Sequence, residues 1–258
     1  MLKEIVSFKK QELSETKQLL SMEELLQQLP EELPFNFESV LSQSGVNIVA
    51  EIKYRSPSRG IFNCQLSPCE LAEVYACNGA RALSILTEQK YFGGKLKFLE
   101  EVGQQVELPL LRKDFIMDRY QLVETRVGGA SAFLLIVACL SDAELRELIS
   151  YGRELKLDAL VEVHDAFELE RAMESGASII GVNNRNLDTF EVNIETSFEL
   201  IRRLDGEEGQ ILVSESGISE HTQIKELQDA GFSAFLVGST LMDSDNPGEM
   251  LCQLVGVE

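Results

Sequence analysis

The chain has 258 residues, of which 44% are apolar, and a formal net charge of −20 at pH 7. This length suits either one (β/α)8 barrel or two smaller domains. The acidic composition argues against a nucleic-acid-binding surface, because phosphate contacts need clustered Lys and Arg, and no apolar stretch approaches the roughly 20 residues of a membrane span.

The five cysteines form no CxxC pair and have no histidine at metal-ligand spacing, so we expect no metal site. Their odd number favours reduced thiols in a cytoplasmic protein. The N-terminus is too charged and interrupted for a secretory leader. The expected partner is a small molecule, with neither nucleic acid nor membrane bound.

Residues 1–45 are predicted to form a helical extension, rich in Leu, Glu, Gln and Lys and interrupted by Pro30 and Pro34. Beyond it, short aliphatic runs alternate with amphipathic stretches, which is typical of repeated βα units. Strands are expected near 47–53, 82–87, 109–113, 132–137, 158–163, 178–183, 210–214 and 233–237. Helices are expected near 67–78, 95–104, 118–128, 141–154, 166–175, 194–204, 219–230 and 246–254.

Local signals support these boundaries. Ser141 and Glu144 have the spacing of a capping box, which satisfies exposed amides at a helix start. Glycines that suit a left-handed residue at a helix end follow several predicted helices, at Gly79, Gly129, Gly176 and Gly231. No linker or low-complexity segment cuts the chain. We therefore predict one domain over 1–258, a (β/α)8 TIM barrel of the α/β class with a helical extension.

Polar residues follow the predicted strands, and the carboxyl ends of parallel strands meet at one end of a barrel. Glu51 and Lys53 lie two apart on the first strand, so their side chains point to the same face. An inward salt bridge that only fills the barrel would look the same. Because a buried ion pair is weakly stabilising once desolvation is counted, a functional pair is favoured.

Lys113 ends the third predicted strand, and Glu162 lies near the end of the fifth. Lys113 could be a general acid, or an amine nucleophile if burial lowers its pKa. Glu162 could be the complementary base. From these two runs alone, separate solvated loops would fit equally well.

Several segments suggest that an anion binds. The segment 56–60 offers hydroxyls, a cation and a glycine for a closing loop, although a solvated turn would look similar. Arg185, with the neighbouring amides 183–186, is poor core material and could fork onto a carboxylate or phosphate. The pairs 216–217 and 238–239 follow the last two strands, where many barrels bind phosphate. Five cations lie at or after apolar runs, at Lys53, Arg55, Arg59, Lys113 and Arg185.

Aromatic and histidine residues give weaker signals. Tyr91 and Phe92 precede two glycines and could form a lid over an aromatic substrate, or simply pack as a loop. His164 and His221 are the two histidines, which gives a Ser-His-Asp triad thin support. Both are interpreted as structural or peripheral. No Gly-x-Gly-x-x-Gly segment opens a helix, so no dinucleotide cofactor is expected.

Six motifs along the chain form a specific set. They are IVAEIKYRSPSRG at 48–60, LTEQKYFGG at 86–94, LRKDF at 111–115, LVEVH at 160–164, IGVNNRNL at 180–187 and VSESGI at 213–218. Together they resemble the indole-3-glycerol-phosphate synthase family, and the similarity runs from the helical extension to residue 242. Such coverage is far more specific than any one motif.

The resemblance implies a carboxy-lyase of tryptophan biosynthesis that needs neither metal nor organic cofactor. Its substrate would be 1-(2-carboxyphenylamino)-1-deoxyribulose 5-phosphate, a phosphorylated aromatic small molecule. Ring closure, decarboxylation and dehydration would give indole-3-glycerol phosphate by general acid-base catalysis. The resemblance also implies the single-function form, without an appended isomerase or amidotransferase region, as a monomer or weak homodimer in the cytoplasm.

The matching positions also imply roles for individual residues. Lys113 would protonate the substrate ketone as the aromatic ring attacks, and Glu162 would handle the proton transfers of dehydration. Lys53 would be a nearby cation and second acid, and the roles of the two lysines are exchangeable. Orienting roles fall to Glu51, Asn183 and Glu215. Substrate contacts are expected from Ser56, Phe92, Phe115, Arg185, Leu187 and Ser216, and phosphate contacts from Ser216, Gly217, Gly238 and Ser239.

Two other functions stay open at this point. In a phosphosugar aldolase or isomerase barrel, Lys113 or Lys53 would form a Schiff base with the substrate. A catalytically silent barrel would bind phosphate without turnover. No expected catalytic group is missing from the sequence, which counts against the silent barrel.

Overall fold

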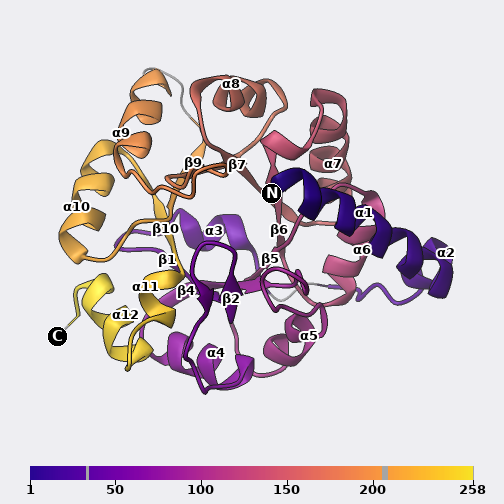
Figure 1. Cartoon of the computed structure of the whole chain (residues 1–258), viewed down its shortest axis with the longest axis horizontal. Coiled ribbons are helices and arrows are strands. Elements are labelled where there is room, and N and C mark those ends of the chain that lie inside the picture. Colours follow the sequence, from indigo (N-terminus) through magenta and orange to yellow (C-terminus); the bar gives the residue numbers. More distant parts are fainter. Residues whose placement is uncertain (33–34, 205–208, 258) are drawn as a thin grey trace.

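The computed structural model describes residues 1–32, 35–204 and 209–257, and its centre is a closed barrel of eight parallel strands (Figure 1). The order around the barrel is β1-β10-β9-β8-β7-β6-β5-β4. All eight predicted strands are present, with ends within two residues of those expected. They are β1 (Ile48–Ile52), β4 (Ala80–Leu86), β5 (Leu110–Lys113), β6 (Ala132–Ile136), β7 (Asp158–Val163), β8 (Ile179–Asn183), β9 (Ile211–Glu215) and β10 (Ala234–Val237).

The eight predicted helices surround this barrel (Figure 1). They are α4 (Pro68–Cys77), α5 (Lys97–Gly103), α6 (Arg119–Val127), α7 (Asp142–Glu154), α8 (Ala166–Glu174), α9 (Glu195–Ile201), α10 (His221–Ala230) and α12 (Pro247–Val255). The sequence reading did not include a hairpin of β2 (Arg55–Ser56) and β3 (Gly60–Ile61), a short α11 (Ser239–Met242), or the single turns η1 (Val137–Cys139) and η2 (Arg202–Leu204).

The local signals do what their chemistry predicts. The Ser141 side chain accepts from the backbone N–H of Glu144, and the Glu144 side chain accepts from the N–H of Ser141, so the capping box at α7 is confirmed. The four glycines expected to be left-handed have φ values between 80° and 115°. Such turns bring each helix back toward the start of the next strand. Pro34, one of the two expected helix breaks, lies outside the described residues.

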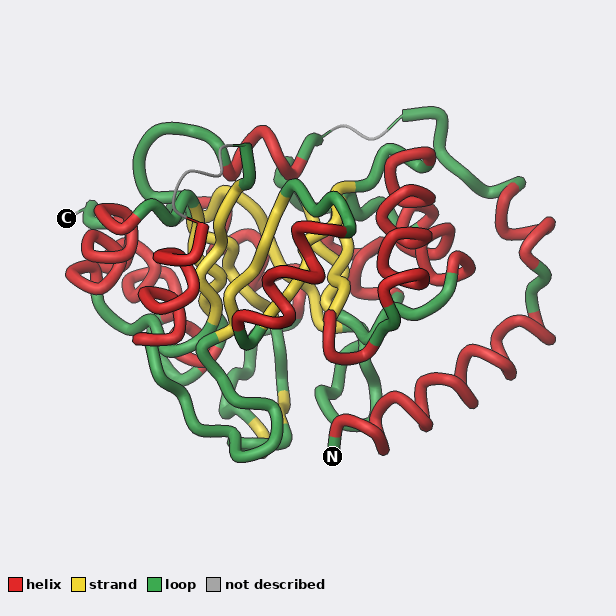
Figure 2. Tube along the Cα trace, turned by 90° about the horizontal axis from the view of Figure 1, so that it is seen from above, coloured by secondary structure: helices red, strands yellow, loops and turns green. Residues whose placement is uncertain are grey.

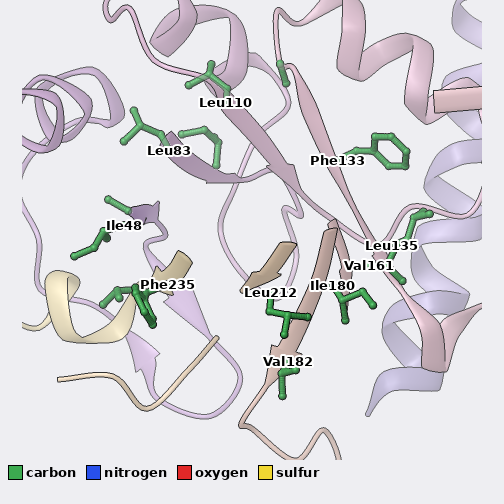
Figure 3. Packing of buried hydrophobic residues seen from close by; sticks show 14 of the residues in the cluster. Ile48, Leu83, Leu110, Phe133, Leu135, Val161, Ile180, Val182, Leu212 and Phe235 are labelled. Carbon is green, nitrogen blue, oxygen red and sulfur yellow. The ribbon is translucent and has the colours of Figure 1, made fainter. Parts of the chain in front are cut away.

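Strand residues alternate between two apolar layers. Side chains such as Leu83, Leu135 and Val161 project outward and pack under the helices (Figure 3). Residues such as Val49 and Leu111 point inward and fill the barrel near the start of the strands. A fully buried side chain of this size contributes about 1.5–3 kcal/mol. This inner apolar layer is the floor on which the polar residues of the next layer lie.

The N-terminal extension runs along the outside of the barrel and contacts both of its ends (Figure 2). It comprises α1 (Leu2–Leu19), α2 (Met22–Leu26) and α3 (Phe37–Leu41). Phe37 and Leu41 are fully buried against the barrel interior, and the N–H of Glu38 donates to Asp158 at the start of β7 (2.9 Å). The helix α3 therefore closes the amino end of the barrel.

At the other end of the barrel, the start of α1 lies over the opening (Figure 1). Met1, Leu2 and Ile5 line the cavity there. The N-terminal extension thus covers the carboxyl end of the barrel with the start of α1 and closes the amino end with α3. No helix in the described part of the chain is long and apolar enough to cross a bilayer.

Candidate active site

One cavity lies at the carboxyl end of the barrel and is lined by residues from all eight strands. Every residue expected from the sequence to act in catalysis, substrate binding or phosphate binding lines it. The expectation that distant strand ends converge is therefore met. Within residues 1–32, 35–204 and 209–257, no group of three or more His, Cys, Asp or Glu side chains could hold a metal ion.

Lys113 lies at the centre of the charged layer. Its Nζ is 3.0 Å from Glu162 Oε2 and 2.5 Å from Glu215 Oε2. Burial alone would lower the pKa of Lys113, but the carboxylates of Glu162, Glu215 and Glu51 outweigh it and raise the pKa above the usual range of a lysine. Lys113 is therefore an ammonium at neutral pH, which suits a proton donor better than an amine nucleophile.

The two carboxyl groups on Lys113 have different affinities for a proton. Burial opposes the charged form of Glu162, but Lys113 and His164 outweigh burial and keep its pKa well below the usual range. For Glu215, burial dominates, Glu162 and Glu51 add to it, and the pKa rises to about 7 although Lys113 acts against the rise. Neighbouring carboxyl groups with such different pKa values are typical of a catalytic site in which one group accepts protons and the other can carry one.

Glycines on two strands make room for this cluster. A Cβ at Gly181 of β8 would overlap the Glu215 carboxylate, and a Cβ at Gly238 would overlap the Glu51 carboxylate. Glu51 Oε1 in turn lies 2.7 Å from Lys53 Nζ. A side chain at either glycine would displace a charged group. Nothing in the sequence indicated that Gly181 has this role.

The segment after β8 divides its polar residues between the pocket and the core. Asn183 Oδ1 accepts from the backbone N–H of Arg185 (3.0 Å), and Arg185 donates to the carbonyl of Phe190 (3.1 Å). Both line the cavity. Asn184 is buried instead, where its Nδ2 donates to Ser214 Oγ (3.1 Å) and its Oδ1 accepts from Ser197 Oγ (2.9 Å). Asn184 thus holds the segment in place, and its neighbours face the cavity.

Two turns form the rim expected to bind phosphate. Ser216 and Gly217 both have left-handed backbones, with φ of 68° and 82°. The Ser216 conformation costs on the order of 1 kcal/mol for a residue with a side chain, and Asn184 supports it by donating to the Ser216 carbonyl (3.0 Å). Gly238 precedes α11, where Thr240 Oγ1 donates to the Ile218 carbonyl (2.6 Å). This bond ties the second turn to the first.

An apolar wall faces the charged layer. The rings of Phe92 and Phe115 have centroids 6.1 Å apart, and Leu187 lines the same cavity. Tyr91 does not line it. The Tyr91 ring packs edge-on against Phe8 of α1 instead, with centroids 6.4 Å apart. Of the two aromatics considered for a lid, Phe92 is the one at the pocket.

Two of the five cations lie outside the cavity lining. Arg55 donates to the carbonyls of Gln89 and Tyr91 (3.1 Å each), so it fastens the loop after β1 to the loop after β4. Arg59 pairs with Asp243 on the surface (2.8 Å). Of the five cations expected near the anion, Lys53, Lys113 and Arg185 line the cavity. The expectation is wrong for Arg55 and Arg59, because loop carbonyls bind the first and a surface carboxylate binds the second.

His164, interpreted from the sequence as structural or peripheral, does not line the cavity. Its Nε2 nevertheless lies 3.2 Å from Glu162 Oε1, directly behind the charged layer. The sequence carried a signal, since inward residues of a strand recur at every second position. Leu160 and Glu162 follow that rule within β7, and His164 is the next alternate position, just after the strand ends. The α1 residues that line the cavity gave no such signal, because their place depends on contacts far along the chain.

Comparison with known proteins gives concordant matches. A sequence model of the family described as indole-3-glycerol phosphate synthase matches residues 2–254. The chain is 46% identical over 220 residues to the indole-3-glycerol phosphate synthase of Sulfurimonas denitrificans, covering 85% of this chain and 83% of that protein. It is 42% identical over 256 residues to that of Aquifex aeolicus, covering 99% and 98%.

Among solved structures, 3-hexulose-6-phosphate synthase from Salmonella typhimurium matches with a TM-score of 0.63. The match covers 82% of this chain and 97% of that one at 13% sequence identity, which shows a shared fold alone. The family match spans nearly the whole chain, and the relatives are 42% identical or more. The chain therefore belongs to the indole-3-glycerol phosphate synthase family.

Proposed function

We propose that this protein converts 1-(2-carboxyphenylamino)-1-deoxyribulose 5-phosphate to indole-3-glycerol phosphate, carbon dioxide and water. The observation that carries the proposal is the Lys113 ammonium held between two carboxyl groups in a cavity with an apolar wall. The reaction needs a proton donor at a ketone and a proton acceptor at the nascent indole. Lys113 and Glu162 lie 3.0 Å apart and suit these two tasks.

The cavity offers a suitable surface to each part of this substrate. Phe92 and Phe115 suit the aromatic ring, with Leu187 beside them. Ser56 and Arg185 suit the ring carboxylate, because a guanidinium binds carboxylates through paired donors. The phosphate is assigned to the two turns formed by Ser216, Gly217, Gly238 and Ser239.

In the first step, Lys113 donates a proton to the ketone oxygen as the ring carbon that bears the carboxylate attacks the carbonyl carbon. One carbon-carbon bond forms and the ketone becomes a hydroxyl group. The carboxylate then leaves as carbon dioxide, and its bonding electrons stay in the ring system. The raised pKa of Lys113 means that the proton is present at neutral pH.

In the second step, the new hydroxyl leaves as water and the indole becomes aromatic. Glu162 is assigned to accept the proton released from the ring system, since its carboxylate form is favoured at neutral pH. Lys53 is the second acid, which protonates the departing hydroxyl. Glu51 holds Lys53 at 2.7 Å, and Asn183 and Glu215 orient the hydroxyls of the substrate chain.

Turnover of the defined substrate tests this function. The purified protein should produce indole fluorescence and release one carbon dioxide per indole formed. Borohydride added with the substrate should trap no covalent adduct on Lys113 or Lys53. A trapped lysine would favour the aldolase or isomerase chemistry, and ligand binding without fluorescence would favour the silent barrel.

We further propose a monomer or weak homodimer that works in the cytoplasm, without metal or cofactor and without nucleic acid. The net charge of −20 supports a self-repelling protein that does not bind phosphate backbones. Light scattering at increasing protein concentration tests the oligomeric state. A stable larger assembly at micromolar concentration would contradict the proposal.

A further inference from the structure

His164 has no role in the reaction described above, yet its ring lies against the assigned base. Its side chain is only 13% exposed, and Nε2 is 3.2 Å from Glu162 Oε1. This contact is an ion pair and not a hydrogen bond, because Nε2 has no hydrogen-bond partner among the described residues. The other oxygen of the same carboxylate, Oε2, lies 3.0 Å from Lys113 Nζ. Glu162 is therefore held between two basic groups, with one at each of its oxygens.

Glu168, in the first turn of α8, fixes His164 from the other side. Glu168 Oε2 accepts from the backbone N–H of His164 (2.8 Å) and lies 2.9 Å from His164 Nδ1. Asp165 in turn caps α8 by accepting from the backbone N–H of Glu168 (2.8 Å). Both ring nitrogens of His164 thus face carboxylates, an arrangement that favours the doubly protonated imidazolium.

We propose that His164 is a positioning residue, which holds Glu162 as an oriented carboxylate through a chain of Glu168, His164 and Glu162. His164 acts through Glu162 and not on the substrate. The inference rests on the proposed function, because that function gives Glu162 its role as base. It adds a group that sets the orientation and the proton affinity of this base.

The charged groups around His164 support this role. Glu162 faces it from β7 and Glu168 from α8, whereas Lys113 of β5 acts on it through Glu162. Burial alone would lower the pKa of His164, but the two carboxylates outweigh burial and raise the pKa to about 10. Cys139, after β6, lies near the same two carboxylates. Burial and the negative charges of Glu162 and Glu168 raise the pKa of its thiol to about 12. The thiol therefore stays neutral, and the charge is carried by the imidazolium.

The protonation state of His164 can be read without any turnover. The chain has two histidines, and His221 bonds to the Leu254 carbonyl (2.9 Å) away from the cavity lining. In a His221→Gln background, the remaining imidazole resonances come from His164. Their titration midpoint should lie above about pH 8, and Glu168→Gln or Glu162→Gln should each lower it by about one unit or more. A midpoint near that of a free histidine would overturn the proposal.

Kinetics then test the effect on Glu162. His164→Gln keeps a donor but loses the charge, so kcat should fall about 10- to 100-fold with KM nearly unchanged, as for a misplaced catalytic group. The acid limb of kcat should move about one unit to higher pH, because Glu162 loses one of its two cations. His221→Gln is the matched control and should leave kcat and its pH profile unchanged.

A purely structural role for His164 would lower the yield of folded protein without moving the acid limb. A folded His164→Gln enzyme with the wild-type kcat and pH profile would therefore overturn the proposal. If that variant does not fold, Glu168→Gln should shift the limb in the same direction by a smaller amount, and an unmoved limb would count against the proposal. Absence of any wild-type turnover would refute the proposed function instead, and the titration would still decide whether His164 is held as an imidazolium.

Discussion

Two buried charge clusters lie on opposite faces of the same strand, β5. Arg112 and Asp114, the first residue after the strand, pair beneath α1 and α6, and Lys113 between them points into the cavity. On the outer side, Asp114 pairs with Arg112 (3.1 Å) and with Lys9 of α1 (3.0 Å) and accepts from Thr87 Oγ1 (2.6 Å). The Asp114 carboxylate is therefore matched by two cations and a hydroxyl, and the same cations also pair with Glu124 and Glu12.

The inner cluster is less fully matched. Lys113 is shared by two carboxyl groups, and Glu215 Oε1 has no hydrogen-bond partner among the described residues. Burial would raise the pKa of Asp114, but Arg112 and Lys9 outweigh it and lower the pKa, whereas burial prevails at Glu215. Matched buried charges fix a structure, whereas a mismatch leaves protons available for exchange.

The largest expected effect is on catalysis at the inner cluster. Lys113→Ala should lower kcat by about 10³-fold or more, because loss of a general acid typically costs 10²- to 10⁴-fold, while the substrate still binds. Indole fluorescence under saturating substrate measures the loss. Lys97→Ala, at an exposed lysine on α5, is the matched control and should keep wild-type turnover. Near-wild-type turnover of Lys113→Ala would remove it as the acid.

The outer cluster should respond in stability. Asp114→Ala leaves Arg112 with Glu124 (3.1 Å) and Lys9 with Glu12 (2.6 Å) as their remaining carboxylates. The cost should therefore lie near the lower end of the about 3–5 kcal/mol for breaking a buried pair. The free energy of unfolding in urea should fall by this amount. The fall should be smaller in Lys113→Ala, because Glu162 keeps His164 nearby and the raised pKa of Glu215 lets that group hold a proton. If Lys113→Ala proved the more destabilising of the two, the division into structural and catalytic clusters would be wrong.

A smaller effect is expected where a glycine makes space for the inner cluster. The Cβ of Gly181→Ala would push the Glu215 carboxylate away from Lys113, and we expect about a 10-fold loss of kcat, in the range of small misplacements. Gly103→Ala is the control, since its Cβ would only touch Leu110 at an ordinary distance (3.5 Å). Equal kcat in both variants would show that the space at Gly181 does not matter.

The smallest effect concerns the pH dependence of stability. The pKa of Glu215 rises from its usual 4.5 to about 7 on folding, so between these values the folded protein keeps a proton that the unfolded chain has lost. The contribution of Glu215 to the free energy of unfolding therefore falls as pH rises through this window. Glu215→Gln should remove from that slope about 1.4 kcal/mol per pH unit, measured by urea titrations at several pH values. A slope identical to that of the wild type would contradict the assigned pKa.

The barrel was predictable from the alternation of apolar runs with amphipathic stretches and from the glycines at helix ends. The apolar runs and the glycines at helix ends placed strands and helices closely, because both depend on neighbours along the chain. The pocket followed from the strand ends, so the sequence predicted that Lys113 and Glu162 meet, and they lie 3.0 Å apart. The position of Arg55 could not be deduced, because the carbonyls that bind it belong to a loop more than thirty residues away. Likewise, the space beside Gly181 is set by a carboxylate on another strand.

Met1 lines the mouth of the cavity, whereas the C-terminal end of the described chain lies at the outer edge of the barrel (Figure 1). Any affinity tag or fusion partner placed before Met1 would begin at the entrance that a substrate must pass. Such an addition would crowd the entrance even if the barrel folded normally. A tag placed after the last residue would leave the entrance free, so kinetic work on this protein is best done with that arrangement.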